Sequence, residues 1–469
     1  MSLETMQLVK SEFLQNKNIQ KLYDTFSFCD NCFSIIHAKI IIIENKVYLQ
    51  KKCNFCNKEV VTLQENDVNF FKDIYGYYNE FYKNFLSFII MPFDKIKYNK
   101  NFSSISVIVT DRCNLNCPIC FRLKQNKNKD LSTSVIEDLL SHIENKWITV
   151  TGGEPTIRED LPLITSLIVK SNNMPMLQTN GIKLSDFNYA KKLKKAGLKY
   201  VHLSFNGFDN KIYEEAYGNK NILEKKLQAL MNMKKLGFKV LLSMAITKDM
   251  KKEIAGTINF AIKNNDFIKG IFMRPIECGE VITNSNIENI LTMSDVAKMI
   301  EAATERRIKL SDFIEYKRFR WNLYRLFLKI FGKNLARKIY PEVAVDVILI
   351  KNSQGSYELL FDNEELSKVN KKINELLYEK NKIKILIKSI PIFFKILLDK
   401  NKFEILFYLL KGKLELSKTA SNLFNNSKII RLWIDKVYTE TNTDLKINIK
   451  TFTLSPLRPF LFTSFSTVT

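Results

Sequence analysis

Glycine and proline are scarce in this sequence, at 14 and 10 of 469 residues. This excludes a collagen-like or broadly disordered chain, and with 46% hydrophobic residues we expect roughly two or three domains with buried cores. No run of about 18 uncharged apolar residues is present, which argues against a membrane-spanning helix. Residues 1–10 lack the apolar segment of a signal peptide, so we expect a cytoplasmic protein.

Acidic residues are also few: 49 Asp and Glu stand against 72 Lys and Arg, which gives a net charge of +23. Such an excess fits an anionic partner, namely nucleic acid, a membrane surface or a phosphorylated substrate. Codon bias is the alternative explanation, because Lys, Asn and Ile are abundant along the whole chain. The charge alone does not choose between these.

Residues 99–282 alternate between strand and helix patterns. The pattern predicts strands at 105–110, 147–151, 174–179, 200–205, 240–246 and 270–275, with helices at 134–145, 186–196, 221–236 and 251–263. Repeated βα units imply a parallel sheet, either doubly wound or curled into part of a barrel. We therefore predict an α/β fold in three regions, 1–98, 99–282 and 283–469.

The flanking regions differ from this pattern. We expect a helical lead-in over residues 1–26, a small hairpin over 34–49 that turns at Glu44 and Asn45, and a helix over 67–93. The extension beyond about residue 282 is predicted to be mostly helical, with a hairpin at 345–360.

Only eight cysteines are present, but seven of them fall in two close groups. Cys113, Cys117 and Cys120 follow the first predicted strand of the βα region with C-x3-C-x2-C spacing. Three thiolates can hold three irons of a [4Fe–4S] cluster and leave the fourth iron open, whereas a closed structural site needs four ligands. The alternatives are a zinc site with a distant fourth ligand, or three unrelated core cysteines.

A second motif follows at the end of the next predicted strand: Gly152, Gly153, Glu154 and Pro155. Paired glycines let the backbone come close to a ligand, and a carboxylate beside them can accept hydrogen bonds from an ammonium group. Alone, this segment could be an ordinary tight turn. Together with the cysteine triplet, it resembles the radical SAM superfamily.

This resemblance implies a partial (β/α)6 barrel of TIM type. It also implies that S-adenosylmethionine (SAM) chelates the open iron, with residues 152–155 aligning its amino group. The reduced cluster would then cleave SAM to a 5′-deoxyadenosyl radical, which abstracts hydrogen from the substrate. A low-potential electron donor, flavodoxin or ferredoxin, is implied as a partner.

Polar residues at later strand ends extend the predicted site. Asn180 ends the third strand, while His202, Ser204 and Asn206 alternate along the fourth and therefore share a face. The resemblance implies that Ser204 and Asn206 approach the SAM ribose, with Asn standing where relatives carry Asp. His202 is a candidate catalytic residue or a hydrogen-bonded core histidine.

Two more candidates lie at or just beyond the sixth strand. Arg274 could meet a carboxylate of SAM or an anionic substrate, or form a surface salt bridge. Cys278 is a candidate hydrogen donor or radical relay, or a small packed residue.

The other four cysteines form two C-x2-C pairs, Cys29 with Cys32 and Cys53 with Cys56, separated by twenty residues. Four thiolates on two knuckles suit tetrahedral zinc or a rubredoxin-like iron. A structural role is favoured because four ligands close the coordination shell. Electron entry to the radical cluster is the rival role.

Over residues 27–282 the chain resembles the branch that contains archaeal tetraether lipid synthase and the radical SAM pterin methylases. The resemblance includes the four-cysteine module and residues 113–121, 152–161, 177–182, 189–193 and 203–209. It implies an oxidoreductase or transferase acting on a hydrophobic or anionic, lipid- or pterin-like substrate. The alternatives are a peptide or tRNA substrate, or a non-catalytic metal-stabilised binding protein. Only Cys278 remains, so the chain cannot supply several cysteine ligands to a second cluster.

The extension carries a basic amphipathic stretch between Arg306 and Lys338, with Phe319, Leu323 and Leu326 at helical spacing. Such a helix could lie on an anionic membrane or grip a lipid head group, making the protein peripheral to the membrane. Nucleic acid is less favoured, because no RNA-binding fingerprint is present. The alternative is a solvated helix whose apolar side packs on the barrel. The apolar, lysine-interrupted segment 383–398 is predicted to line a buried or lipid-facing pocket.

Overall fold

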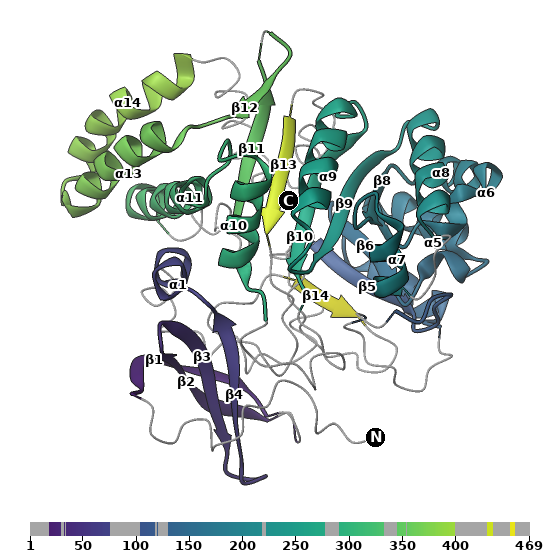
Figure 1. Cartoon of the computed structure of the whole chain (residues 1–469), viewed down its shortest axis with the longest axis horizontal. Helices are drawn as coiled ribbons and strands as arrows, with labels where there is room; N and C mark the ends of the chain where they lie inside the picture. Colours follow the sequence, from purple (N-terminus) through teal and green to yellow (C-terminus); the bar gives the residue numbers. More distant parts are fainter. Residues whose placement is uncertain are drawn as a thin grey trace.

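The structure is a computed structural model of the whole chain. It describes residues 18–29, 32, 34–75, 104–117, 120, 130–217, 222–276, 290–332, 345–352, 354–398, 429–434 and 451–454. Within these ranges the strands form two sheets, one of four strands and one of ten. Figure 1 shows the four-stranded sheet below the larger one, which the helices flank.

The N-terminal sheet is antiparallel and follows the chain order, with strands β1 Gln20–Phe28, β2 Ile35–Ile43, β3 Lys46–Cys53 and β4 Lys58–Glu65. Glu44 and Asn45 have positive φ values of 50° and 63°, as a tight two-residue hairpin requires, so the predicted hairpin is confirmed. The predicted helical lead-in is wrong from Gln20 onward. These residues instead pair antiparallel with the isoleucine-rich β2, whose edge they cover.

Helix α1, Val68–Tyr75, follows this sheet and contacts helix α11, Leu310–Phe331. It confirms the first part of the helix predicted over 67–93, and residues 76–93 lie outside the described ranges. Phe70, Phe71 and Ile74 are buried, so the helix joins the N-terminal sheet to the core of the larger body.

Six parallel strands in chain order form the centre of the larger sheet. They are β5 Ser104–Thr110, β6 Trp147–Gly152, β7 Met174–Thr179, β8 Tyr200–Ser204, β9 Lys239–Ile246 and β10 Ile268–Pro275. The helices between them are α4 Thr133–Ser141, α5 Leu161–Lys170, α6 Phe187–Lys195, α7 Asn210–Tyr217, α8 Ile222–Lys235 and α9 Lys251–Lys263. Short 3-10 turns, η4 Pro155–Ile157 and η5 Ile182–Ser185, follow β6 and β7. Over the described residues these strands form an open sheet in chain order with the helices between them, in agreement with the predicted partial barrel.

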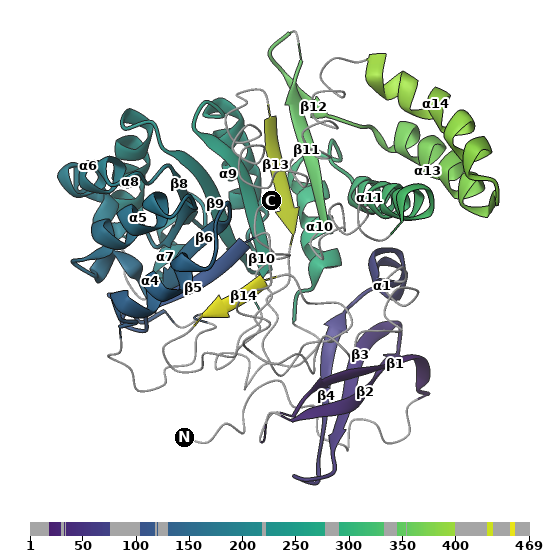
Figure 2. The ribbon, with the colours of Figure 1, turned by 180° about the vertical axis from the view of Figure 1, so that it is seen from behind.

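The two faces of this sheet bury different residues. Val107, Val150 and Leu203 face outward and pack against the helices, which lie along the outer side in Figure 2. Alternate residues of the same strands face inward. Their large side chains form a separate cluster of Trp147, Met176, Tyr200, Leu241, Phe272 and Trp433.

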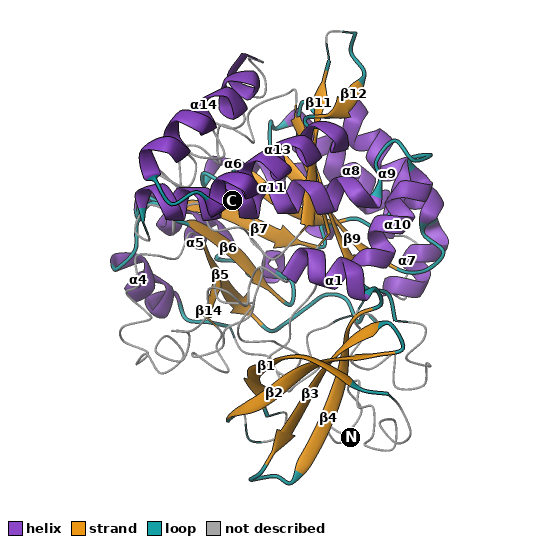
Figure 3. Cartoon of the chain, turned by 90° about the vertical axis from the view of Figure 1, so that its left-hand side faces the viewer, coloured by secondary structure: helices purple, strands orange, loops and turns teal. Residues whose placement is uncertain are grey.

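The C-terminal region supplies both helices and strands. Its elements are α10 Met293–Ala303, α11, β11 Val345–Lys351, β12 Tyr357–Leu359, α13 Asn363–Tyr378, α14 Lys382–Leu398, β13 Ile429–Ile434 and β14 Thr451–Leu454. The hairpin predicted at 345–360 is confirmed by antiparallel β11 and β12. A region predicted as mostly helical therefore also adds four strands to the barrel sheet. Strand β13 pairs with β10 (Figure 1), and β14 pairs with β5, beside which it lies in Figure 3.

The basic helix α11 is bound to its neighbours through both its apolar and its charged residues. Phe319 and Leu326 are buried against the C-terminal elements. Arg318 forms ion pairs with Asp73 of α1 and with Glu315. The apolar side of the helix is therefore covered by protein, as the solvated-helix alternative expects. Among the described residues, no helix is both long and apolar enough to cross a membrane.

Candidate functional site

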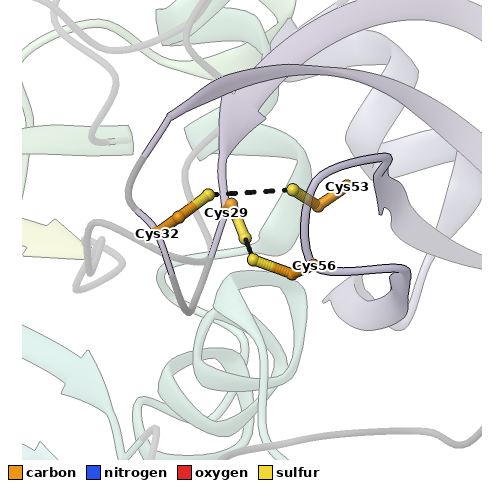
Figure 4. A group of neighbouring side chains, drawn as sticks. All are labelled: Cys29, Cys32, Cys53 and Cys56. Carbon is orange, nitrogen blue, oxygen red and sulfur yellow. Dashed lines mark hydrogen bonds between the residues drawn. The ribbon is translucent and has the colours of Figure 1, made fainter.

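The four N-terminal cysteines converge in space, as their spacing predicts. Cys29 and Cys53 lie at the ends of β1 and β3, and Cys32 and Cys56 follow each of them on a short turn (Figure 4). The Sγ atoms of Cys29 and Cys56 are 3.8 Å apart and those of Cys32 and Cys53 are 3.7 Å apart. All four sulfurs lie within 4.8 Å of one another.

These distances fit one metal ion. Four thiolates at about 2.3 Å from a tetrahedral zinc lie about 3.8 Å from each other. The N–H of Cys29 donates to the carbonyl of Ser34 at 2.9 Å and closes the first knuckle. Hydrogen bonds from the hydroxyl and backbone of Ser34 lower the pKa of Cys32 to about 6, which favours the thiolate that a metal binds. The donor set can therefore hold zinc, or iron in the rubredoxin manner.

The cysteine triplet follows β5, at the end of the sheet where chemistry is expected. The N–H of Cys120 donates to the carbonyl of Cys117 at 3.2 Å, and the N–H of Leu115 lies 3.4 Å from the sulfur of Cys113. Burial and the neighbouring thiols Cys120 and Cys113 raise the pKa of Cys117 to about 12, so a bound cation would be needed to hold its thiolate at neutral pH.

Within the described residues, only the N-terminal cysteines lie close enough together to share one metal ion. The three thiols after β5 are not part of that group, and the [4Fe–4S] cluster that their spacing along the sequence predicts stays a prediction.

The two glycines after β6 hold the cysteine loop in place. The N–H of Gly153 donates to the carbonyl of Thr110, and the N–H of Glu154 to that of Arg112, both at 2.8 Å. A Cβ at Gly152 or Gly153 would overlap the carbonyl oxygen of Thr110 or Arg112, respectively. The glycines therefore admit the backbone that leads to Cys113, and the predicted approach of a ligand to them stays a prediction.

Glu154 is buried and its carboxylate is surrounded by donors of its own chain. Oε1 accepts hydrogen bonds from the hydroxyls of Thr156 and Thr179, each at 2.6 Å, and Oε2 accepts one from the N–H of Asn180 at 2.7 Å. The side-chain amide of Asn180 in turn donates to Asn114 in the cysteine loop at 2.8 Å. Two predicted residues, Glu154 and Asn180, therefore join the ends of β6 and β7 to the loop.

Lys226 of α8 belongs to this group and was not predicted. It is fully buried, and its ammonium donates to the carbonyls of Asn180 at 2.7 Å and Ser204 at 2.5 Å. Burial lowers the pKa of Lys226 to about 7, against the opposing fields of Glu154 and Cys117. The sequence signal was a lysine in a position that the helical period assigns to the buried side of α8.

The polar residues after β8 serve the barrel itself. The side-chain oxygen of Asn206 accepts from the N–H of Ala245 at 3.0 Å, and its own N–H donates to the hydroxyl of Tyr213 at 3.0 Å. Asn206 therefore ties β8 to β9. The predicted contacts of Ser204 and Asn206 with the SAM ribose stay predictions.

A row of polar side chains lies on the inner face of the sheet, beside the apolar cluster there. Thr151 donates to the side-chain oxygen of Gln178 at 3.0 Å, and Gln178 is the strand partner of His202. His202 meets the ring of Phe272 edge-on at 5.6 Å, and the guanidinium of Arg274 covers that ring at 4.4 Å. The predicted residues His202 and Arg274 are therefore brought together.

His202 is buried, and its Nε2 has no hydrogen-bond partner in the described structure. Burial and the charge of Arg274 lower its pKa to about 3, so the imidazole is neutral at working pH. The structure does not test whether His202 is a catalytic residue or a core histidine, so its role stays a prediction. Cys278, the remaining candidate, lies outside the described residues.

Comparisons with known proteins agree with this arrangement. Residues 107–261 match the radical SAM superfamily, and residues 22–58 match the HMPTM N-terminal zinc ribbon domain. The chain is 33% identical over 318 residues to the 7,8-dihydro-6-hydroxymethylpterin dimethyltransferase of Methanocaldococcus jannaschii, covering 62% of this chain and 60% of that protein. It is 31% identical over 206 residues to a probable GTP 3′,8-cyclase of Sulfolobus acidocaldarius, covering 42% and 64%.

The chain thus spans about three fifths of the length of these relatives. Among solved structures, Streptococcus suis SuiB bound to S-adenosylmethionine is similar with a TM-score of 0.37 and 16% identity, over 56% of this chain and 69% of that one. Because that score is low, the fold assignment depends on the strand order described above. Residues 107–261 are thus a radical SAM domain that follows an HMPTM-type zinc ribbon, and over 318 residues the chain resembles the radical SAM pterin methylases.

Proposed function

We propose that this chain is a radical SAM transferase that modifies a pterin-like heterocycle. The observation that carries the proposal is the similarity to the pterin dimethyltransferase, which runs over 318 residues, whereas the radical SAM domain alone spans 107–261. The match of residues 22–58 to the HMPTM N-terminal zinc ribbon domain extends the similarity beyond the radical SAM domain. Methyl transfer is the finer part of the proposal and is tested separately.

The residues after β5 and β6 suit the cofactors of this chemistry. Cys113, Cys117 and Cys120 would hold three irons of a [4Fe–4S] cluster. When bound, the cluster and SAM supply an organic radical that abstracts hydrogen from the substrate. The protein's part is positioning: Glu154 and Lys226 fix the strand ends around the cysteine loop through the hydrogen bonds described above.

The inner face of the barrel supports an uncharged, flat substrate. Gln178 and His202 offer neutral hydrogen-bonding groups, and His202 is held edge-on against the buried ring of Phe272. Arg274 adds one cation, while Arg431, on the same face, is held by Asp346 at 2.6 Å. A nucleoside triphosphate would need several cations for its phosphates. Among the described residues, this face therefore favours a heterocycle with ring nitrogens and a carbonyl over a substrate like GTP.

Anaerobic reconstitution with iron and sulfide tests the proposal. With dithionite in place of a flavodoxin or ferredoxin donor, the holoenzyme should release 5′-deoxyadenosine from SAM, and Cys117→Ala should abolish that release. A wild type that binds no cluster, or binds one without cleaving SAM, would instead be a metal-stabilised binding protein.

A second assay tests the substrate. We expect 7,8-dihydro-6-hydroxymethylpterin to stimulate 5′-deoxyadenosine release and to gain the mass of added methyl groups, while GTP does neither. Stimulation by GTP alone would contradict the pterin proposal. Stimulation by the pterin without a gain in mass would contradict only methyl transfer.

A further inference from the structure

Helix α14 carries an apolar stripe that faces solvent. Figure 1 shows the helix at the outer edge of the molecule, beside α13. Its exposed side chains are Ile383 at 67%, Leu386 at 43%, Ile387 at 60%, Ile390 at 61% and Phe394 at 57% of their full accessible surface. They recur at steps of three and four residues and therefore lie on one side of the helix. We call these five residues the α14 stripe.

The opposite side of α14 already provides its packing on the protein. Ile385 and Ile392 are buried in a cluster that includes Ile373 and Leu376 of α13 and Phe319 of α11. Attachment of the helix therefore does not require the stripe, which is a second apolar side. Five large side chains left together in water are costly, because each would gain free energy from burial.

The charges of α14 are all of one sign. Residues 382–398 contain no Asp or Glu. At 100° per residue, Lys384 and Lys388 lie on one flank of the stripe and Lys382 on the other. Lys388 approaches Glu379 at 3.5 Å, while keeping 62% of its side chain exposed. The stripe is therefore bordered by cations on both sides.

We propose that the α14 stripe rests on an anionic membrane surface, with its apolar side chains at the headgroup–acyl boundary and its flanking lysines on acidic headgroups. Long lysine side chains suit this position because their stems reach past apolar neighbours to the headgroups. Charge complementarity selects this occupant, since a net charge of +23 draws the whole chain towards an anionic surface. A second copy fits less well, because two facing stripes would bring their flanking lysines together.

Vesicle flotation of the full-length protein tests the proposal. We expect the wild type to float with phosphatidylcholine vesicles that contain phosphatidylserine, and to be released from them at high salt. The double variant Ile387→Ser with Ile390→Ser should weaken binding to these vesicles about 10- to 30-fold. Serine at both positions removes half or more of the free energy that the two isoleucine side chains gain on transfer from water to the membrane. Lys384→Gln should weaken it about fivefold.

The matched control is Leu163→Ser with Met231→Ser, which removes two apolar side chains of similar exposure, 53% and 59%, from α5 and α8. It should float like the wild type, and both double variants should keep the wild-type melting temperature. Equal flotation of wild type and the α14 variant would overturn the proposal, as would no flotation at low salt. A dimer in light scattering that only the α14 variant loses would assign the stripe to a second copy.

Discussion

Glu65 is buried where the N-terminal sheet meets the barrel, and its ionisation should set how the stability of this junction depends on pH. It ends β4 and is fully buried against the start of α10. Oε1 accepts hydrogen bonds from Ser294 at 2.6 Å, from the N–H of Asn66 at 2.9 Å and from Thr292. Oε2 has no hydrogen-bond partner in the described part of the chain. Burial raises the pKa of Glu65 from 4.5 to about 7.

The direction of the effect follows from proton binding. Between about pH 4.5 and 7 the folded protein keeps a proton on Glu65 that the unfolded chain has lost, so the free energy of unfolding falls as pH rises. Each pH unit is worth about 1.4 kcal/mol, which gives about 3 kcal/mol in total. The contribution of protonated Glu65 to the free energy of unfolding is thus fully present below about pH 4.5 and is lost as the pH rises through about 7.

Glu65→Gln removes the charge, keeps the shape of the side chain and retains an acceptor oxygen for Ser294. At about pH 8 the variant should melt about 3 °C above the wild type, because about 3 kcal/mol is divided by the large unfolding entropy of a chain of this length, and this gap should narrow at about pH 5. Circular dichroism or scanning fluorimetry measures it. Glu59→Gln, at a partly exposed site on the same strand, is the control and should show no such change. An equal gap between wild type and Glu65→Gln at both pH values would refute the reasoning.

Three further changes test the metal site and the cysteine loop. Cys32→Ser should abolish zinc or iron binding at the N-terminal site and expose the amides of that sheet to hydrogen exchange. The reconstituted cluster at the cysteine triplet should remain. An unchanged metal content at the N-terminal site would contradict this prediction. Gly153→Ala should reduce 5′-deoxyadenosine release at least about tenfold, because the new Cβ would overlap the carbonyl of Arg112, whereas Gly256→Ala on α9 should have no effect. Lys226→Met should weaken SAM binding about tenfold in calorimetry, because it removes the donor that joins two strand ends; an unchanged affinity would count against that role.

The sequence predicted the fold well where the signal is local. The βα units carry their own apolar strands and helices, and two of the helices end at a glycine: Gly197 and Gly237, with φ of 101° and 68°, follow α6 and α8. The strands at 429–434 and 451–454 could not be predicted this way. They pair with β10 and β5, which lie far away along the chain. The hydrophobic pattern of a short segment does not indicate which distant strand it pairs with.

The candidate site was predicted to a similar extent. The motif spacing pointed to Cys113 and Glu154, and the structure places them after β5 and β6; their roles towards the cluster and SAM stay predictions. Lys226 was missed because a lysine in a helix usually indicates a solvated side, and only the packed barrel shows it among carbonyls. The role of Gly153 was also unforeseen, because the backbone that it approaches belongs to a different strand.

The position of β13 and β14 has a consequence for the synthesis of the protein. Both borders of the six-stranded parallel sheet are completed by strands that follow it in the chain, from residues 429–434 and 451–454. Until those residues have left the ribosome, β5 and β10 would present unpaired backbone amides and carbonyls to other chains. The barrel sheet can therefore be completed only after residues 429–454 have been translated. A nonsense mutation ahead of residue 429 would leave a nascent core prone to aggregate, even though every residue of the cysteine loop had been made.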